Sequence, residues 1–487
     1  MPDEARRQAE MADPTTSVSI PDLSDIESEF KGEILRPGTP AFGESRYIFN
    51  TRWVGRDPAL IVKPKNTEEV ASVMRYASAR GIPVGIRSGG GHGVDGSAMP
   101  EGQLVIDLSA FKDIEFDLET LQVTLGPGVV LGEMDTASEA HGLVVPAGTV
   151  SNTGVAGLAL GGGVGYNMRR FGATVDSMLS CEVVTADGRV VTASKTENPD
   201  LFWALRGAGH NYGVVTSLTF QAHKAGPIVG GGAVIYHLED APAVLKKLRE
   251  YMKTAPRELS MIAALVPTPP MPGVPEEYYG VVKMSLLTVY TGDLANLDSV
   301  VGELAALGTP AAVAVQPMPW HIVNSILDEA APYGRRVHTR GGYFEALTDE
   351  IIEITTSRAA IAPPPEVPGP STVQNIWFMG GAISEDFDED SVSFSREGAG
   401  IFWESVAQWD SPENDDTFAA WVDGNGDTLQ PLMLGNGYCN LTTDRGPEWL
   451  SRLYGKPAKW ERLVDLKTKW DPQNLFRFNK NIKPKGA

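Results

Sequence analysis

Residues 87–96 read R-S-G-G-G-H-G-V-D-G, a turn in which one histidine, His92, stands among glycines. Glycine reaches positive φ and lets the backbone approach a ligand closely. Consecutive exposed N–H groups in such a turn form a concave anion site that suits a pyrophosphate. The small neighbours would also let a flat ring reach the imidazole. The stretch by itself is equally consistent with a glycine-rich surface turn that carries an incidental histidine.

The residues before this turn predict an α/β unit. Residues 60–63 (L-I-V-K) are typical of a short buried strand. Asn66, followed by two acids, predicts a helix start, and an apolar stripe at helical spacing continues to Gly81. Residues 84–86 then form a strand that leads into the glycine turn, so the order is strand, helix, strand.

The next part of the chain continues with short elements. We predict strands at 104–108, 121–125 and 214–220, helices at 131–141 and 199–205, and a hairpin turning at Asp187 and Gly188. The glycines Gly207, Gly209 and Gly213 suggest a dinucleotide-binding turn. We reject that interpretation because the spacing is one residue too long and a helix, not a strand, precedes it.

The composition of the sequence changes near residue 225, where a new strand begins and proline clusters follow. We expect residues 1–25 to form a flexible N-terminus, 26–225 a first domain, 226–434 a second domain, and 435–487 a return to the first domain. The second domain is expected to be an antiparallel sheet with helices on one face.

The composition excludes several classes of protein. A chain of 487 residues favours two domains, and its net charge of −21 argues against nucleic acid or an anionic membrane as a partner. The two cysteines, Cys181 and Cys439, form no C-x-x-C pair, so we predict no metal site and expect both in the core. No signal segment or membrane-spanning run is visible, and we expect a cytoplasmic location.

Several further stretches carry a resemblance. Residues 154–171 read G-V-A-G-L-A-L-G-G-G-V-G-Y-N-M-R-R-F, 200–216 read D-L-F-W-A-L-R-G-A-G-H-N-Y-G-V-V-T, and G-Y-C-N at 437–440 precedes D-P-Q-N-L-F-R at 471–477. With the histidine turn, these blocks resemble the FAD-linked oxidases of the berberine bridge enzyme type, within the vanillyl-alcohol oxidase superfamily. The resemblance spans about residues 45–225 and 375–485 and is weak between them.

This resemblance implies an α+β fold. It implies a PCMH-type FAD-binding domain of two α/β subdomains, formed by residues 26–225 and 435–487. It also implies a substrate-binding domain at 226–434 whose antiparallel sheet is covered by helices. The residues it assigns to the cofactor are Arg87, Ser88, Gly89, Gly90, Gly91, His92, Gly93, Gly154, Gly157, Gly161, Gly162, Gly163, Gly165, Tyr438 and Asn440.

The resemblance also implies how the flavin is attached. His92 would bond the 8α-methyl carbon of FAD, which prevents loss of the cofactor and makes the ring a stronger oxidant. Some relatives add a cysteine bond from the position of Val150, so we expect a single covalent bond here. Leu158 stands where relatives carry a further histidine.

Three residues are expected to act in catalysis, Glu404, Tyr438 and Asn440, and either Glu404 or Tyr438 would be the base. Glu404 occupies the position of a glutamate base in some relatives, and burial would raise its pKa toward neutrality. The alternative is a surface glutamate on an amphipathic strand. Tyr438 and Asn440 match a Y-x-N motif beside the flavin and substrate, although Tyr438 could instead be a packed core aromatic.

The second domain offers candidates for binding the substrate, for each of which core packing is the alternative: Trp320, His321, Tyr343, Trp377 and Trp403. The expected activity is removal of a hydride from a C–OH or C–NH carbon of a small or aromatic compound, with O2 giving hydrogen peroxide. An oligosaccharide oxidase and an inactive flavin-binding protein stay open. So does a dehydrogenase, because Thr153 lies where relatives gate oxygen. The oligomeric state is open too.

Overall fold

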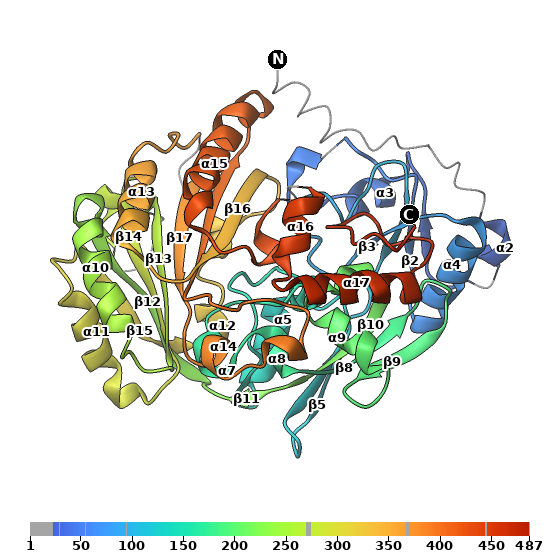
Figure 1. Ribbon diagram of the computed structural model, residues 1–487, viewed down its shortest axis with the longest axis horizontal. Helices are drawn as coiled ribbons and strands as arrows, with labels where there is room; N and C mark the ends of the chain where they lie inside the picture. The colour runs from blue at the N-terminus through green and yellow to red at the C-terminus, as the bar shows by residue number, and fades with distance from the viewer. Residues whose placement is uncertain are drawn as a thin grey trace.

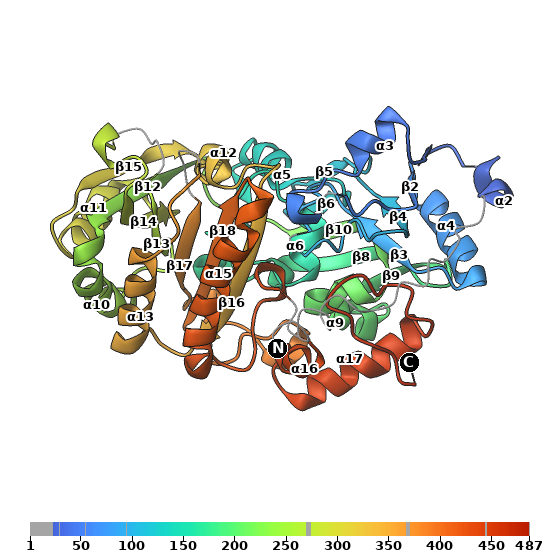
Figure 2. The ribbon, with the colours of Figure 1, turned by 90° about the horizontal axis from the view of Figure 1, so that it is seen from above.

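The computed structural model describes residues 23–28, 30–53, 55–93, 95–268, 274–366, 371–443 and 446–486 (Figure 1). Nearly all of the predicted flexible N-terminus, 1–25, lies outside these residues. The described chain forms mixed helices and sheets, as the sequence predicts, and its sheets are grouped in two halves (Figure 2). Among these residues no helix has the length and apolar character needed to cross a membrane.

The first sheet holds the strands around the histidine turn. Its order is β1 (Glu33–Leu35), β2 (Leu60–Lys63), β4 (Leu104–Asp107) and β3 (Val84–Arg87), with β2, β4 and β3 parallel. Helix α4 (Thr67–Arg80) begins at Asn66, whose side chain accepts a hydrogen bond from the Glu69 N–H. It ends at Gly81, whose φ of 62° is left-handed and favours glycine. The predicted strand–helix–strand unit is confirmed.

The second sheet has five antiparallel strands in the order β5 (Ile114–Asp117), β6 (Gln122–Leu125), β10 (Val214–Gln221), β8 (Met178–Val184) and β9 (Val190–Ser194). The β8–β9 pair confirms the predicted hairpin. The helices of this half are α2 (Ser24–Glu27), α3 (Pro40–Ser45), α5 (Leu131–Glu139), α6 (Val155–Leu160), α7 (Met168–Phe171), α8 (Thr174–Ser177) and α9 (Pro199–Ala208). A small ladder joins β7 (Leu143–Val144) and β11 (His223–Lys224).

The third sheet has seven antiparallel strands and lies within the segment predicted as the second domain. Its order is β15 (Ala312–Pro319), β12 (Ile228–His237), β14 (Val282–Tyr290), β13 (Leu259–Pro267), β17 (Thr372–Phe378), β18 (Ile401–Trp409) and β16 (Arg336–Phe344). Helices α10 (Ala241–Met252), α11 (Leu297–Ala305), α13 (Asp349–Ala360) and α15 (Asp415–Leu429) cover its outer face (Figures 1 and 2). The short helices α12 (Trp320–Val323) and α14 (Ala382–Glu385) lie in its connections.

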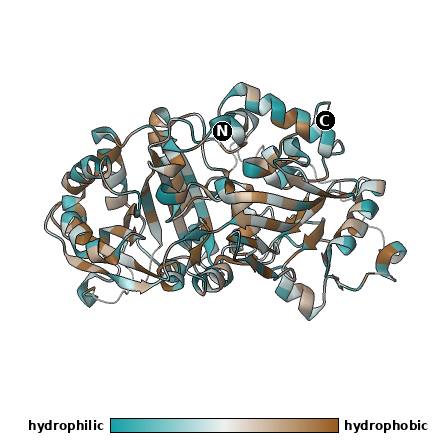
Figure 3. Ribbon diagram, turned by 90° about the horizontal axis from the view of Figure 1, so that it is seen from below, coloured by the Kyte–Doolittle hydropathy of each residue, from teal (hydrophilic) through white to brown (hydrophobic). Residues whose placement is uncertain are grey.

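The strands of this sheet separate two environments by alternation. Along β18, Trp403 packs into the core beneath the helices, whereas Glu404 faces the first half of the chain. Figure 3 shows hydrophobic residues concentrated along the strands and hydrophilic residues frequent on the outer helices. The inner face of the sheet therefore presents its side chains to the histidine turn.

The C-terminal segment packs against the first half of the chain. Helix α17 (Pro457–Trp470) lies beside α9, and helix α16 (Pro447–Leu453) packs against α17 (Figure 2). The Tyr212 hydroxyl donates to the Leu463 carbonyl over 2.9 Å. The buried pair Lys467–Asp471, at 2.6 Å, fixes the end of α17. This return brings residues 438–441 and 479–480 to the same cavity as His92.

Candidate active site

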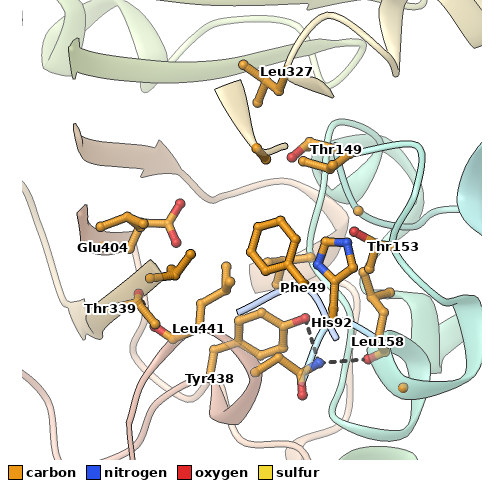
Figure 4. Close-up of a pocket in the computed structure, with 18 of the residues that line it drawn as sticks. Phe49, His92, Thr149, Thr153, Leu158, Leu327, Thr339, Glu404, Tyr438 and Leu441 are labelled. Carbon is orange, nitrogen blue, oxygen red and sulfur yellow. Dashed lines mark hydrogen bonds between the residues drawn. The ribbon is translucent and has the colours of Figure 1, made fainter. Parts of the chain in front are cut away.

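A cavity of about 410 Å³ lies between the inner face of the seven-stranded sheet and the glycine turn. That volume is within the range of small-molecule and cofactor sites. Side chains of β13, β14, β16, β17 and β18 form one wall. The opposite wall comes from residues 88–98, 148–158 and the C-terminal return (Figure 4).

The histidine turn contributes part of its backbone to this wall. Ser88, Gly91, His92 and Gly93 line the cavity, and Gly91 has a left-handed φ of 52°. Gly89 and Gly90 lie behind the wall instead. A Cβ on Gly90 would stand 2.3 Å from the Gly154 nitrogen, so the two glycine segments touch backbone to backbone.

Arg87 was predicted to bind the cofactor, but its side chain does not reach the cavity wall. Its Nη1 donates to Asp107 Oδ2 over 2.6 Å, and the Asp107 side chain is fully buried. The pair joins the ends of β3 and β4. Arg87 therefore fixes the start of the glycine turn rather than lining the cavity.

The imidazole of His92 is held on three sides. It stacks on Phe49 with the ring centroids 4.3 Å apart and the planes 7° from parallel, and Tyr333 meets it edge-on at 5.5 Å. Nε2 lies 2.6 Å from Asn152 Oδ1. Burial lowers the pKa of His92 to about 4, against a smaller opposing effect of the Asn152 hydrogen bond. The ring is therefore neutral near pH 7 and keeps a nucleophilic lone pair.

The second glycine segment divides into two parts. Gly154 and Gly157 line the cavity, together with Val150, Thr153 and Leu158; Figure 4 shows Thr153 and Leu158 beside His92. The other four predicted cofactor glycines are placed behind the wall: Gly161, Gly162, Gly163 and Gly165. A Cβ on Gly161 would stand 2.2 Å from Asn440 Oδ1. The triplet thus makes room for the C-terminal return instead of contacting the cavity.

Tyr438 and Asn440 meet at the cavity. Asn440 Nδ2 donates to the Tyr438 hydroxyl oxygen and to the Leu158 carbonyl, each over 3.0 Å (Figure 4). Burial raises the pKa of Tyr438, and the Asn440 hydrogen bond opposes the shift only in part. The phenol is therefore neutral at pH 7. The two side chains thus lie side by side, although residues 439–441 form a 3-10 turn and not the extended segment that the alternation argument assumes.

Glu404 reaches the cavity from the centre of β18. It is only 4% exposed, which excludes the alternative of a surface glutamate. Its Oε1 accepts two hydrogen bonds, from Asn375 Nδ2 at 2.7 Å and from Trp377 Nε1 at 3.1 Å. Burial raises the pKa of Glu404, and the two hydrogen bonds oppose that shift. A carboxylate in this environment suits a general base.

Of the five predicted substrate-binding residues, only Trp377 lies on the cavity wall. Trp320 and His321 lie in α12, where they bond Asp135 and Glu139 of α5. Tyr343 is fully buried and packs edge-on against Phe402. Trp403 points to the opposite face of the sheet because it neighbours Glu404 on one strand. These four residues therefore pack in the core or bond a neighbouring helix, and they do not line the cavity.

Three residues of the site were not predicted from the sequence: Phe49, Asn152 and Asn375. Phe49 lies outside the glycine turn and reaches His92 through tertiary packing. Asn152 comes 60 positions after His92, and Asn375 stands 29 positions before Glu404. Only the strand register that pairs Asn375 with Glu404 could have indicated that contact.

FAD, the cofactor that the resemblance implies, fits the residues present. Glycine backbone at Gly91, Gly93, Gly154 and Gly157 leaves close approach open to a ligand. The sheet wall is largely apolar, as a flat aromatic ring requires, and a neutral imidazole stands between these surfaces. Among the described residues no group of three His, Cys, Asp or Glu side chains could hold a metal ion.

Comparisons with known proteins agree with this fit. The FAD binding domain family matches residues 58–194, and the berberine and berberine-like family matches residues 437–483. An FAD-linked oxidoreductase of Dictyostelium discoideum is 29% identical over 95% of this chain and 97% of its own length. The (R)-6-hydroxynicotine oxidase of Paenarthrobacter nicotinovorans is 27% identical over 94% of this chain and 98% of its own.

A solved structure is similar over the same extent. The xylooligosaccharide oxidase of Myceliophthora thermophila, in complex with xylobiose, superposes with a TM-score of 0.82 at 25% identity. The match covers 95% of this chain and 99% of that one. The fold predicted from the sequence is thereby confirmed.

Proposed function

We propose that this chain, an FAD-linked oxidoreductase of the berberine bridge enzyme-like family, oxidises a small, largely apolar compound at a carbon that bears a hydroxyl or an amine. One observation carries the proposal. Glu404 from the sheet and His92 from the glycine turn reach a single cavity from its two walls (Figure 4). A flavin joined to His92 would then have a buried carboxylate on the side from which a substrate arrives.

FAD would be held by one covalent bond, through His92. Val150 lines the cavity but offers no thiol. Cys439 also reaches the wall, but burial raises its pKa to about 11, and its Sγ lies 3.4 Å from the Gly161 carbonyl oxygen. A protonated thiol is a poor nucleophile. The neutral imidazole of His92 is therefore the side chain best suited to form the link.

Bound FAD supplies the acceptor for a hydride. The protein's own contribution is the base and its orientation. Because Oε1 of Glu404 is occupied by two donors, Oε2 is the oxygen that faces a substrate O–H or N–H and withdraws its proton. Loss of that proton drives the hydride from the adjacent carbon. The Tyr438 hydroxyl, held by Asn440, lies at the same cavity and would orient the reacting group.

The sheet wall supports a compound with an apolar body. Ile262, Val266, Leu287, Val373 and Val406 line this wall together with Glu404. Sugars need many paired hydroxyl groups, and each one left unpaired in such a wall costs free energy. An aromatic amine or alcohol is therefore favoured over an oligosaccharide. Reoxidation by O2 with release of hydrogen peroxide completes the proposed cycle.

The test is anaerobic bleaching of the flavin by 6-hydroxynicotine, other aromatic amines and alcohols, and xylobiose. We expect an aromatic compound to bleach it, and Glu404→Gln to slow bleaching by about 100-fold or more, the usual contribution of a general base. Glu413→Gln, the same change at an exposed site, is the control and should have no effect. A Glu404→Gln rate equal to wild type would refute the base assignment.

Other outcomes of the same experiment would distinguish the alternative functions. Bleaching by xylobiose alone would indicate a sugar oxidase. Bleaching without peroxide formation in air would indicate a dehydrogenase with another acceptor, for which Thr153 on the cavity wall is the residue to change. No bleaching by any compound would indicate a flavin-binding protein without catalysis.

A further inference from the structure

We infer that the substrate carries a second hydroxyl group at its far end, and that Gln408 and Ser371 bind this hydroxyl. The inference rests on the proposed function, because it takes Glu404 as the residue that faces the reacting carbon. Among the described residues, neither Gln408 Oε1 nor Ser371 Oγ has a hydrogen-bond partner, and both residues line the cavity. Gln408 is only 7% exposed and Ser371 only 1%. Buried polar atoms without a partner cost free energy, so two of them on a cavity wall indicate a ligand that pairs them.

The strand register places the two side chains next to each other. Ala407 of β18 pairs with Thr372 of β17, and the next pair along the strands is Gln408 with Ser371. The Gln408 N–H donates to the Ser371 carbonyl over 2.6 Å. Residues that lie directly opposite each other project to the same face of the sheet, with Cβ atoms about 4.5–5.5 Å apart. One small group of a ligand can therefore contact both side chains.

The orientation of the Gln408 amide decides what that group must be. Nε2 donates to the Ala330 carbonyl over 2.6 Å, and a carbonyl only accepts, so the free end of the amide is its oxygen. A ligand hydroxyl satisfies both partners, because it donates to Gln408 Oε1 and accepts from Ser371 Oγ. An ether or ketone oxygen has no proton to donate to Gln408. An N–H group could donate to both atoms but would leave the Ser371 proton without an acceptor.

The distance from Glu404 sets the length of the substrate. Gln408 follows Glu404 by four positions on β18, so their Cα atoms lie roughly 13 Å apart at about 3.3 Å per residue. Hydrogen bonds of about 2.8 Å at both ends leave roughly 8–13 Å between the two polar groups of the substrate. One aromatic ring is too short for this distance, and two linked rings reach it. Between the two ends the wall holds Val406 and Val373, which pair in the register and offer only hydrocarbon.

A third buried hydroxyl lies in another direction from Glu404. Ser285 lines the cavity, and its Oγ also has no partner among the described residues. Ser285 stands on β14, three strands across the sheet, in the row that includes Ala264, Asn375 and Glu404. A group bound there would lie across the strands and not along β18. We favour the Gln408 end because two unpartnered atoms adjoin there, and Ser285 serves to distinguish the two directions.

The experiment measures binding by calorimetric titration of the flavin-loaded protein, with its flavin reduced beforehand so that no hydride transfer disturbs the signal. The probes are biphenyls with a hydroxymethyl group at one para position and a hydroxyl, methyl or methoxy group at the other. We expect the hydroxyl compound to bind about 5- to 150-fold more tightly than the methyl compound, the effect of two neutral hydrogen bonds. The methoxy compound should gain nothing over the methyl compound, because its oxygen cannot donate to Gln408.

The variants test which residues produce this preference. Ser371→Ala and Gln408→Met should each lower the binding ratio, and the double variant should lower it to less than about twofold. Ser260→Ala and Gln374→Met are the matched controls and should leave the ratio unchanged. Ser260 and Gln374 are also buried with one polar atom unpartnered among the described residues, but neither lines the cavity. The Gln374 amide even donates to a carbonyl, that of Thr355, as the Gln408 amide does to that of Ala330.

Equal binding of the hydroxyl and methyl compounds by the wild type, or a ratio that survives in the double variant, would overturn the inference. So would binding of neither compound, or a ratio that is lost in Ser285→Ala. If Gln408→Met does not fold, an unchanged ratio in Ser371→Ala is the contradicting result. Flavin bleaching by the same compounds distinguishes this inference from the proposed function. Bleaching by both compounds without a binding preference would overturn the inference alone, whereas the predicted ratio without any bleaching would count against the proposed function and leave the hydroxyl site in place.

Discussion

Asn375 and Glu404 face each other on β17 and β18, and the Asn375 amide donates to Oε1 of the carboxylate over 2.7 Å. Trp377, two residues along the same strand, donates to the same oxygen from its indole N–H. One oxygen of the proposed base is thus fixed to the sheet, and the other is the oxygen that we propose as the proton acceptor. The pair also opposes the rise in pKa that burial causes.

Removing one of these donors should therefore shift the pH profile of flavin reduction. The donors stabilise the ionised carboxylate, so Trp377→Phe should raise the pKa of Glu404 further. One hydrogen bond to a charged group corresponds to about one to two pKa units. The rate should fall at neutral pH and recover at higher pH. Trp403→Phe, a buried substitution on the other face of the sheet, should leave the profile in place. A profile that is identical in both variants and the wild type would contradict the account.

A substitution at Gly161 tests how the C-terminal segment packs against the second glycine segment. Because a Cβ there would stand 2.2 Å from Asn440 Oδ1, Gly161→Ala should displace Asn440 and weaken its hydrogen bonds to Tyr438 and Leu158. We expect a loss of about 1–3 kcal/mol in the free energy of unfolding, as for other overpacked sites, and a lower flavin content in the purified protein.

Gly302 in α11 offers the control for that substitution. A Cβ at Gly302 would meet nothing within 4 Å. Gly302→Ala should therefore stabilise the helix by about 0.5–1 kcal/mol. Denaturant unfolding of both variants, with flavin absorbance measured on the same samples, makes the comparison. Equal stability and equal flavin content in the two would argue against the role given to Gly161.

Asp135 gives a prediction about pH and stability. It lies buried between α5 and α12, where Trp320 Nε1 and Asn324 Nδ2 donate to its two oxygens over 2.9 and 2.5 Å. Burial raises its pKa to about 7, despite those hydrogen bonds. The unfolded chain releases this proton near pH 4. Between these pH values the folded state binds more protons, so the contribution of Asp135 to stability falls as the pH rises from about 4 to 7.

Asp135→Asn should remove this dependence. The variant should be more stable than wild type at pH 8 by about 2–4 kcal/mol and nearly equal to it at pH 4. Asp298→Asn, an exposed change on α11, should shift stability by less than about 0.5 kcal/mol at either pH. Unfolding curves at the two pH values check this, and a stability difference that is the same at both would contradict it.

The sequence predicted the local elements well where turns and caps have strict requirements. Asn66 and Gly81 marked both ends of α4, and the Asp187-Gly188 turn marked the β8–β9 hairpin. The contact between Asn152 and His92 depends on two loops that meet only in the folded chain, and no local pattern indicates it. The assignment of Trp403 to substrate binding could have been avoided from the sequence, because neighbouring residues of a strand point to opposite faces and Glu404 was already assigned to the site. The role of Arg87 could not be predicted from the sequence, because its position beside the glycine turn does not reveal that it pairs with Asp107.

The central claim is that FAD is joined to His92 within this cavity. The most direct measurement is the mass of the tryptic peptide 88–112 from protein that was purified with its flavin and then denatured. The account predicts that this peptide carries one flavin, located on His92 by fragmentation, and that His92→Ala loses the yellow colour of the denatured protein. An unmodified peptide from yellow protein, with all flavin released on denaturation, would contradict it.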